Sequence, residues 1–433
     1  MPETIKCDVV IAGMGVAGLY CALNLPESMH VVLLAKADAA TCDSMLAQGG
    51  ICVLHDESDY ESFFEDTLRA GHYENRLESV DIMIRSSRTV INDLINRCNV
   101  EFEHDENGEL SYTREGGHSR ARILYHADIT GQEITTKLLA KVRQLPNATI
   151  LENTEMTDII EGFDERGQRL CSGMVAQGLD GERIEIQAPA TVIATGGIGG
   201  LYERSTNFPI LMGDGCRICA EHGVILEHMD YVQIHPTSLW TKKPGRSFLI
   251  SESARGEGAV LLNDAGGRFV DELLPRDVVT AAIFEEMERT GAEHVWLSFA
   301  NVPREEITGH FVHIYEHCLE EGYDITREPI PVVPAQHYFM GGIHVNSDSE
   351  TTLPHLFACG ETACNGVHGR NRLASNSLLE SLVFAKRAAD KIMRDHFAQD
   401  TSLNMAMTAR EFTQIFQTYP KKISIKNLAG LED

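Results

Sequence analysis

The sequence predicts an α/β fold in which a nucleotide-binding domain is interrupted by a smaller α+β domain. Three observations support this prediction. A glycine-rich turn, Gly13-Met14-Gly15-Val16-Ala17-Gly18, follows an apolar run near the N-terminus. A second apolar run, residues 356–361, meets a glycine much later in the chain. Between them, from about residue 229 to 338, short segments rich in His, Arg and Gly have a different character.

The glycine-rich turn stands in the strand–turn–helix context that is typical of a Rossmann-like dinucleotide site. Residues 7–11 form the apolar run and residues 17–25 a helix-forming segment. Gly13 permits the tight turn, Gly15 lets a pyrophosphate approach, and Gly18 allows close packing of helix on strand. The diphosphate would lie at the helix N-terminus, where unpaired N–H groups favour negative charge. The alternative interpretation is an ordinary tight βα turn.

The second strand bears on the choice of dinucleotide. Residues 31–35 are apolar and β-branched, as expected of a neighbouring parallel strand. Lys36 follows at the place where an NAD-binding unit often has an acidic residue for the ribose hydroxyls. The sequence therefore favours NAD less and leaves FAD open.

The remaining segments alternate between helical and extended patterns. Residues 41–53 are predicted to form a small loop that runs into a short strand, and residues 101–126 to form polar turns with a basic cluster, Arg114, Arg120 and Arg122. A β-meander is suggested by residues 149–152, 170–177 and 183–187, and a buried strand by residues 190–197. Helices are predicted over residues 59–72, 78–97, 130–142, 377–396 and 406–418, and from after residues 213–215 to His222.

These segments group into three predicted parts. Residues 1–228 and 339–400 would form a discontinuous dinucleotide-binding domain, because the later residues return to its pattern. Residues 229–338 would form a capping domain for the substrate. Residues 401–433 would be a residual C-terminal helical tail.

Bulk composition excludes several classes of function. The formal net charge of −27 argues against nucleic acid as a partner. We expect no membrane span, since no run of 18 apolar residues occurs, and no signal peptide, since the first strand begins almost at once. The 11 cysteines show no framework, and Cys216 and Cys219 have no second pair at zinc-ribbon spacing. A cytoplasmic protein without a metal site is therefore expected.

Six motifs occur from the start of the chain to about residue 395. They are residues 13–18, Ala47-Gln48-Gly49-Gly50-Ile51, Ala194-Thr195-Gly196-Gly197, His235-Pro236-Thr237, Ser253-Ala254-Arg255-Gly256-Glu257-Gly258 and residues 369–380. In this order they resemble the flavoprotein family of succinate dehydrogenase, fumarate reductase and L-aspartate oxidase. The loop Arg114-Glu115-Gly116-Gly117-His118-Ser119, followed by Ile123-Leu124, looks like that of the aspartate-oxidising members rather than that of the dehydrogenases.

The resemblance implies FAD as the cofactor. Residues 14–17 would contact the diphosphate, Lys36 the adenosine side, and residues 43–50 the flavin ring. Membrane-bound relatives have a flavin-linking histidine just before the A-Q-G-G segment, where this chain has Asp43, so non-covalent FAD is expected. Gln48 and the N–H groups after it would stabilise the reduced ring. The implied cofactor-binding residues are Gly13, Met14, Gly15, Val16, Ala17, Gly18, Lys36, Asp43, Ser44, Met45, Leu46, Ala47, Gln48, Gly49, Gly50, Asp214, Glu361, Ser377 and Leu378.

The resemblance also implies the substrate residues. His235, His337 and Arg372 would bind the carboxylates of a dicarboxylate, with Arg255 behind them. Residues placed nearby are Gln233, Ser251, Glu252 and Ser375. Arg276 takes the position of the family's catalytic arginine. A free arginine lies about 5–6 pKa units from acting as a base at pH 7. We therefore expect electrostatic and positioning work from Arg276, with proton transfer to fumarate in the other half-reaction.

Glu115 is expected to distinguish an amino-acid substrate, because it can pair with the α-ammonium and would repel a further carboxylate. The implied function is oxidation of L-aspartate to iminoaspartate by hydride transfer to FAD, with reoxidation by dioxygen or fumarate. The product would feed quinolinate synthase and NAD biosynthesis.

Two alternative functions stay open. One is a soluble fumarate reductase or succinate oxidase without amine recognition. The other is a flavoprotein scaffold or electron-transfer subunit, against which the full set of Arg and His positions argues. The family's C-terminal helical domain is expected to be almost absent, which bears on oligomer contacts more than on chemistry.

Overall fold

The computed structural model describes residues 3–416. The chain divides into two compact units, Met1–Ala389 and Asp390–Asp433, and the first contains every predicted site residue. Helix α10 (Ser377–Phe416) begins in the first unit and continues into the second. The predicted helix over residues 406–418 is therefore not a separate element, and its last two residues lie outside the described range.

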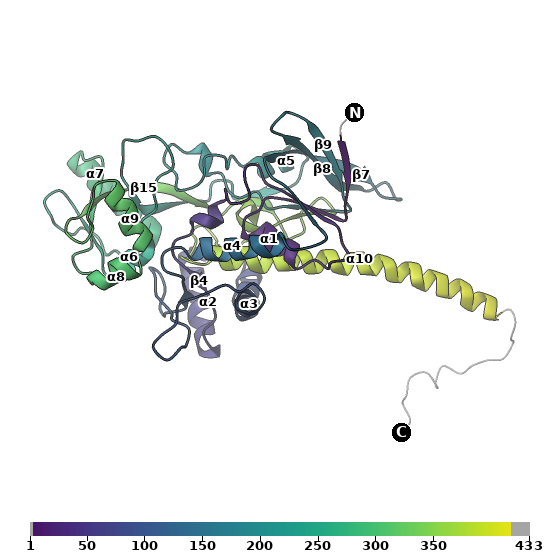
Figure 1. The fold of residues 1–433 in the computed structure, drawn as a ribbon, viewed down its shortest axis with the longest axis horizontal. Coiled ribbons are helices and arrows are strands. Elements are labelled where there is room, and N and C mark those ends of the chain that lie inside the picture. Colours follow the sequence, from purple (N-terminus) through teal and green to yellow (C-terminus); the bar gives the residue numbers. More distant parts are fainter. Residues whose placement is uncertain (1–2, 417–433) are drawn as a thin grey trace, which may run out of the picture. The chain divides into compact units, whose positions relative to one another are not determined.

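A five-stranded parallel sheet forms the centre of the first unit (Figure 1). All of its strands except the edge strand β6 are fully buried, and each is an apolar run, as expected where both faces of a sheet are covered. β17 pairs with β10, so the chain after the insertion returns to the first sheet. The strands in spatial order are β17 (Leu356–Ala358), β10 (Ala190–Ile193), β2 (Val9–Ala12), β3 (Val31–Leu34) and β6 (Ala148–Leu151).

A second sheet carries a correction to the predicted meander. Residues 149–152 were expected in it, but β6 pairs in parallel with β3 in the central sheet. The third strand of the meander is instead β7, a partly polar run that begins three residues after β6 ends and so merges with it in the sequence. In spatial order this sheet is β1 (Glu3–Lys6), β9 (Arg183–Gln187), β8 (Arg169–Gly178) and β7 (Thr154–Phe163).

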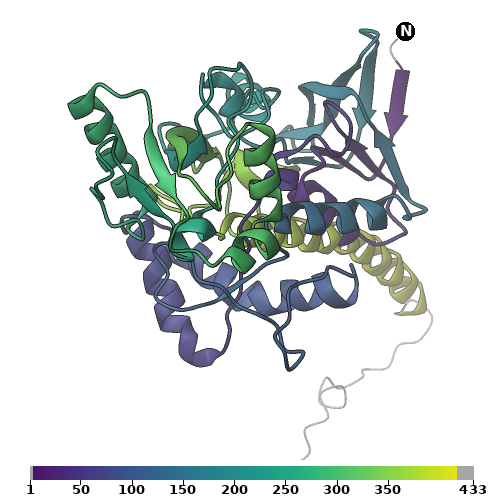
Figure 2. The same ribbon diagram turned by 60° about the vertical axis from the view of Figure 1, so that its left-hand side comes forward.

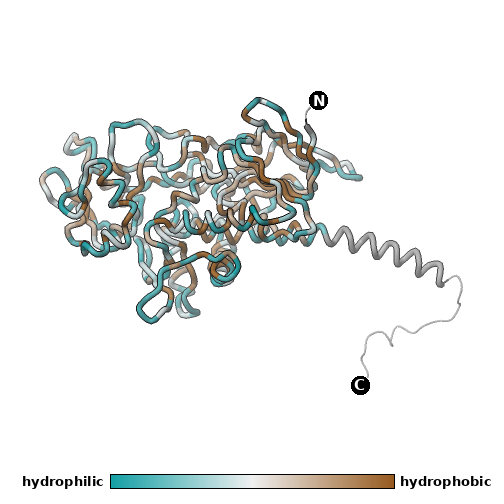
Figure 3. The backbone as a smooth tube through the Cα atoms, viewed as in Figure 1, coloured by the Kyte–Doolittle hydropathy of each residue, from teal (hydrophilic) through white to brown (hydrophobic). Residues whose placement is uncertain are grey.

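One hydrophobic core joins the two sheets. It contains Val10 and Val32 of the central sheet together with Met156, Met174 and Ile186 of the second sheet. Hydrophobic residues follow the strands of this unit, and hydrophilic residues occupy the connecting loops (Figure 3). This core fixes the strand ends from which the site residues project.

The helices of the first domain lie close to the predicted ranges. α1 packs on α4, and both are seen together in Figure 1. α2 packs on α3. Their bounds are α1 (Val16–Leu23), α2 (Tyr60–Ala70), α3 (Leu77–Asn96), α4 (Thr130–Val142) and α5 (Asp214–Glu221), with 3-10 turns at Asp43–Leu46, Glu57–Asp59, Gly199–Leu201 and Gly360–Thr362.

The inserted segment has a sheet and an apolar core of its own (Figure 2, green). Every buried member of this core lies between Leu239 and Val332. That supports a capping domain over residues 229–338, which stays a prediction. The antiparallel sheet runs β12 (Val232–Leu239), β15 (Ile330–Phe339), β14 (Val295–Ser298) and β13 (Val260–Leu262). Its helices are α6 (Glu252–Gly256), α7 (Arg276–Thr290), α8 (Arg304–Gly309) and α9 (Val312–Glu320).

Two small sheets tie the parts of the first unit together. β11 (Leu226–Glu227), β16 (Gly342–His344) and β18 (Ala363–Cys364) bring the two connections of the inserted segment side by side. β4 (Ile51–Cys52) pairs with β5 (Ile123–Leu124), which fixes the loop of Glu115 against the segment of Gly49. Among the described helices, none has the length and apolar character needed to cross a membrane.

Candidate active site

A large cavity lies at the carboxyl ends of the central strands and extends to the inserted segment. In open parallel sheets, ligands bind outside these strand ends. The predicted cofactor residues all line the cavity except Gly18 and Met45. So do Glu115, His235, Arg276, His337 and Arg372, together with Ser251, Glu252 and Ser375, whereas Gln233 does not. The structure therefore brings nearly all the predicted residues to one place.

The glycine-rich turn has a shape that only glycine can adopt. Gly13 has a φ of +110°, and a Cβ there would lie 1.9 Å from the Ala194 carbonyl oxygen. A Cβ at Gly18 would lie 2.0 Å from the Gly13 oxygen, which explains the requirement for close packing although Gly18 lies off the cavity. The first turn of α1 contains no acidic residue that would repel an anion, and the N–H of its first residue, Val16, donates to Ser44 Oγ at 3.1 Å.

Lys36 lies at the adenosine end predicted for it and is held by two carboxylates. Its Nζ is 2.8 Å from Glu155 Oε1 and 2.8 Å from Asp214 Oδ2. Burial would lower the pKa of Lys36, but these two bonds outweigh burial and raise it. Lys36 therefore stays protonated with its charge offset by two carboxylates, and it lines the cavity, as the predicted adenosine contact requires.

The segment predicted to pass the flavin has unsatisfied polar atoms. Asp43 Oδ2 and Gln48 Oε1 are buried at cavity-lining residues and have no hydrogen-bond partner among the described residues. A Cβ at Gly49 would lie 2.5 Å from Glu115 Oε1, and one at Gly50 2.2 Å from the Leu124 oxygen. This wall thus combines polar atoms that have no partner with two glycines, which carry no side chain. A flat ring with polar edges could lie against such a wall, so the residues present fit FAD.

Two half-buried carboxyl groups on this wall have raised pKa values. Burial raises the pKa of Asp43 to about 7 and that of Glu361 to about 8. Glu361 accepts from the backbone N–H of Phe339 at 2.9 Å, and Asp43 from that of Phe208 at 2.8 Å. At neutral pH Glu361 is therefore mostly protonated and would donate a hydrogen bond to a hydroxyl.

Arg276 is the first residue of α7 and is fixed by two neighbours. Its Nε donates to Glu252 Oε2 at 2.5 Å, and its Nη1 donates to Gln233 Oε1 at 2.8 Å. Gln233 in turn donates to the Arg372 carbonyl oxygen at 2.8 Å. The structure thus places Gln233 behind the two arginines, where it sets their spacing, and not on the cavity wall as predicted. Arg255 is also buried behind the site, 3.0 Å from Glu252 Oε1.

The two histidines of the site are neutral donors. Burial and the neighbouring arginines lower the pKa of His235 and His337 well below the ordinary value. His235 Nδ1 lies 3.2 Å from both the backbone N and the carbonyl oxygen of Thr237. The other ring nitrogen, Nε2, and the Nε of Arg372 are buried without a hydrogen-bond partner in the described part of the chain. Both atoms belong to cavity-lining residues, so both are available to a ligand.

Glu115 links the inserted segment to the returning one. Its Oε1 accepts from Ser253 at 2.8 Å and its Oε2 from Ser375 at 2.6 Å. Burial raises the pKa of its carboxyl group. Glu252, although buried, has a lowered pKa because Arg255 and Arg276 lie beside it. Three buried arginines and two buried glutamates leave a site charge of +1 with both glutamates ionised, and +2 with Glu115 protonated.

Several cavity residues were not predicted from the sequence. Arg246 follows Pro244 and Gly245 and so looks like part of a solvated turn, yet it lines the cavity near Asp43. Tyr338 lies under the Arg372 guanidinium, 4.4 Å from ring centre to Cζ. Tyr338 could have been identified from its neighbour in the sequence, His337, which was predicted as a substrate residue. Among the side chains of residues 3–396 we find no group of three or more His, Cys, Asp or Glu that could hold a metal ion.

The sheet, the glycine turn and the cavity define a flavoprotein that binds FAD, and comparison with known proteins agrees. A family model described as "FAD binding domain" matches residues 8–378. An L-aspartate oxidase of Clostridium perfringens is 49% identical over 89% of this chain and 86% of its own length. One of Nostoc sp. is 41% identical over 94% of this chain and 70% of its own length.

Solved structures give the same result at the level of the wider family. Escherichia coli quinol fumarate reductase is 30% identical, with a TM-score of 0.83 over 90% of this chain and 70% of that one. A Mycobacterium smegmatis Sdh1 structure is also 30% identical, with a TM-score of 0.75 over 92% of this chain and 72% of that one. The chain belongs to the L-aspartate oxidases, within the flavoprotein family of succinate dehydrogenase and fumarate reductase. The predicted fold class and FAD cofactor are confirmed, and the protein is an FAD-dependent oxidoreductase.

The cofactor should be dissociable. Asp43 stands where the resemblance places a flavin-linking histidine, and a carboxylate at that position cannot form the histidyl bond. We expect purified protein to be yellow and acid precipitation to release all the flavin into the supernatant. Flavin absorbance measured in both fractions tests this, and flavin retained in the washed pellet would contradict it.

Proposed function

We propose that this protein oxidises L-aspartate to iminoaspartate. The observation that carries the proposal is the buried carboxyl group of Glu115, which lines the cavity together with Arg276, Arg372 and His235. A dicarboxylate needs donors at both ends, which Arg276, Arg372 and His235 offer. Only a substrate with an α-ammonium also needs an acceptor, and Glu115 offers it. Zwitterionic aspartate carries a charge of −1, which matches the site when both glutamates are ionised.

The chain's residues would bind and orient the substrate. Arg276 is aimed by Glu252 and Gln233, so it would meet a carboxylate without reorganising. Charge-assisted bonds to such an arginine are worth about 1.5–3 kcal/mol each. Neutral His235, whose Nε2 has no partner among the described residues, would add one neutral donor. FAD, when bound, supplies the acceptor for the hydride that leaves the substrate carbon.

The electron acceptor and the metabolic place are further parts of this proposal. Fumarate has two carboxylates and would use the same donors, so fumarate or dioxygen would reoxidise the cofactor. Iminoaspartate would be consumed by quinolinate synthase, toward NAD. We also propose a cytoplasmic location, because the cysteines show no disulfide framework.

A comparison of three substrates tests the proposal. Aerobic peroxide formation and anaerobic bleaching of the flavin would be measured with aspartate, succinate and glutamate. We expect aspartate to support both signals, and glutamate, one methylene longer, to give far less. A protein that is bleached by succinate and not by aspartate would be a soluble succinate oxidase or fumarate reductase, the alternative considered above.

The inserted segment is predicted to close over the ligand. Both of its connections pass through the paired strands β11 and β16, so it would move as a hinged body. Closure would bring Arg276 and His235 onto the ligand and exclude water. Limited proteolysis near residues 225 and 340 should therefore be slower when a dicarboxylate is present. Equal rates with and without the ligand would contradict a mobile cap.

A further inference from the structure

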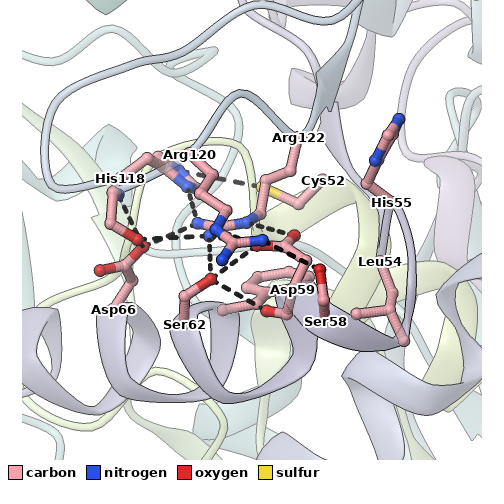
Figure 4. Close-up of polar contacts among 12 residues, drawn as sticks. Cys52, Leu54, His55, Ser58, Asp59, Ser62, Asp66, His118, Arg120 and Arg122 are labelled. Carbon is pink, nitrogen blue, oxygen red and sulfur yellow. Dashed lines mark hydrogen bonds and ion pairs between the residues drawn. The ribbon is translucent and has the colours of Figure 1, made fainter.

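A buried charged cluster lies next to the active-site loop without lining the cavity. Its centre is Arg122, whose side chain is fully buried (Figure 4). Arg122 binds Asp59 through Nε and Nη2, both at 2.9 Å, and Asp66 through Nη1 at 2.8 Å. Asp59 precedes α2 and Asp66 lies on it, so the arginine is anchored to the start and the middle of one helix.

The carboxylates of this cluster are ionised and held in place by arginines. Burial alone would raise the pKa of Asp59 and Asp66, but bonds from Arg122 to both, and from Ser119 to Asp66, lower it. Both carboxylates are therefore ionised at neutral pH. Arg69 binds Asp66, and Arg120 lies 3.8 Å from Asp59, so three arginines, two of them half-exposed, face two carboxylates and leave a formal charge of +1 on the cluster. Because its guanidinium group bonds to both carboxylates, the side chain of Arg122 is held in one orientation.

Arg122 determines which tautomer His118 adopts. Arg122 Nη1 lies 2.9 Å from His118 Nδ1, and a guanidinium only donates hydrogen bonds, so Nδ1 is the acceptor. The ring proton is therefore on Nε2, which donates to the Ala374 carbonyl oxygen at 3.0 Å. Burial and the charge of Arg122 lower the pKa of His118 to about 4, so the ring is neutral at neutral pH.

His118 holds Glu115 in two ways. Its backbone N–H donates to the Glu115 carbonyl oxygen at 3.2 Å, which closes a turn from Glu115 to His118. Its ring fixes Ala374, and the next residue, Ser375, donates to the Glu115 carboxylate. Ser375 Oγ also accepts from the Gly50 N–H at 3.2 Å. Residue 118 thus holds the backbone that carries the carboxylate through its own N–H, and its imidazole holds the segment of the hydroxyl that orients the carboxylate.

We propose that Arg122 and His118 are positioning residues for Glu115, and that they set the preference for an amino-acid substrate over a dicarboxylate without an amine. This inference rests on the proposed function, in which Glu115 binds the substrate ammonium. Neither residue lines the cavity, so neither touches the substrate. They act through the Ala374 carbonyl group and the turn that begins at Glu115.

Three substitutions test this. His118→Phe keeps a ring but removes the two hydrogen bonds of the imidazole, one with Arg122 and one with Ala374. His118→Gln places an amide oxygen toward Arg122 and an amide N–H toward Ala374, and so replaces both. Ser119→Ala is the matched control, because it removes a 2.7 Å bond to Asp66 in the same cluster and leaves His118 intact. The measurements are kcat/KM for aspartate and for fumarate, flavin content and Tm.

We expect His118→Phe to lower the aspartate-to-fumarate ratio of kcat/KM at least tenfold, mainly through a higher KM for aspartate. His118→Gln should recover most of this loss. Ser119→Ala should lower Tm and leave the ratio unchanged. If His118→Phe does not yield folded holoenzyme, His118→Asn carries the same test, because it keeps the acceptor for Arg122 but is too short to reach Ala374.

A parallel Glu115→Gln variant separates the possible failures. If it changes the ratio and the His118 variants change only Tm, His118 has a structural role and the positioning inference is wrong. If Glu115→Gln also leaves the ratio unchanged, both the inference and the ammonium role of Glu115 are wrong. A ratio that falls equally in Ser119→Ala would likewise overturn the specific role of His118.

Discussion

Replacing Arg276 with glutamine is expected to lower kcat/KM for L-aspartate by about two to four orders of magnitude. A paired arginine makes two charge-assisted bonds to a carboxylate, of about 1.5–3 kcal/mol each, and both are lost. The expected loss of transition-state stabilisation is therefore about 3–6 kcal/mol. Steady-state kinetics on protein of matched flavin content would measure it. A loss smaller than tenfold would show that Arg276 is not a principal substrate contact.

The same substitution has a second effect that must be separated from the first. Glu252 would lose a 2.5 Å partner and keep Arg255 at 3.0 Å, and a buried carboxylate that loses one of its two arginines destabilises the fold. The double variant Arg276→Gln with Glu252→Gln should regain stability but not activity. Arg268→Gln is the control, because Arg268 pairs with Glu272 in the same segment, is half-exposed and does not line the cavity. It should leave kcat/KM unchanged.

The sequence predicts the fold well where local chemistry decides it. The turn at Gly13 and Gly18 can be predicted from the sequence, because a side chain at either position would collide with the backbone and glycine is therefore required. The buried strands are readable as apolar runs. The strand at residues 149–152 was assigned to the wrong sheet, because pairing partners depend on tertiary contacts that periodicity does not encode.

The site is predictable only in part, for a similar reason. Residues in motifs, such as His235 and Arg372, reach the cavity as expected. The position of Gln233 behind Arg276 depends on side-chain direction, which spacing along one strand does not determine. Arg122 was visible only as part of a basic cluster. Its partners Asp59 and Asp66 lie far away in the sequence, so its burial could not be anticipated.

Glu115→Gln is expected to lower kcat/KM for aspartate by about one to two orders of magnitude and to spare fumarate. Two charges 4 Å apart at an effective dielectric near 20 interact by about 4 kcal/mol before desolvation. A net loss of about 1.5–3 kcal/mol follows for aspartate. Fumarate has no ammonium and would lose a repulsive neighbour. The ratio of the two kcat/KM values should therefore fall at least tenfold, with flavin content unchanged.

The pH dependence of the same pair of reactions tests the charge of Glu115 directly. Because burial raises its pKa, kcat/KM for aspartate should fall on the acid side at a pH above the ordinary 4.5 of a glutamate. Below that point the protonated group no longer attracts the ammonium, whereas a dianionic fumarate gains from a site charge of +2. Glu252 has a lowered pKa and stays ionised there.

His235 and His337 could also titrate in acid, since their pKa values are lowered, but their contribution would survive in Glu115→Gln. If the fall of kcat/KM for aspartate toward acid pH is lost in Glu115→Gln, the fall is due to protonation of Glu115. If the fall is unchanged in that variant, Glu115 holds the loop and does not bind the amine.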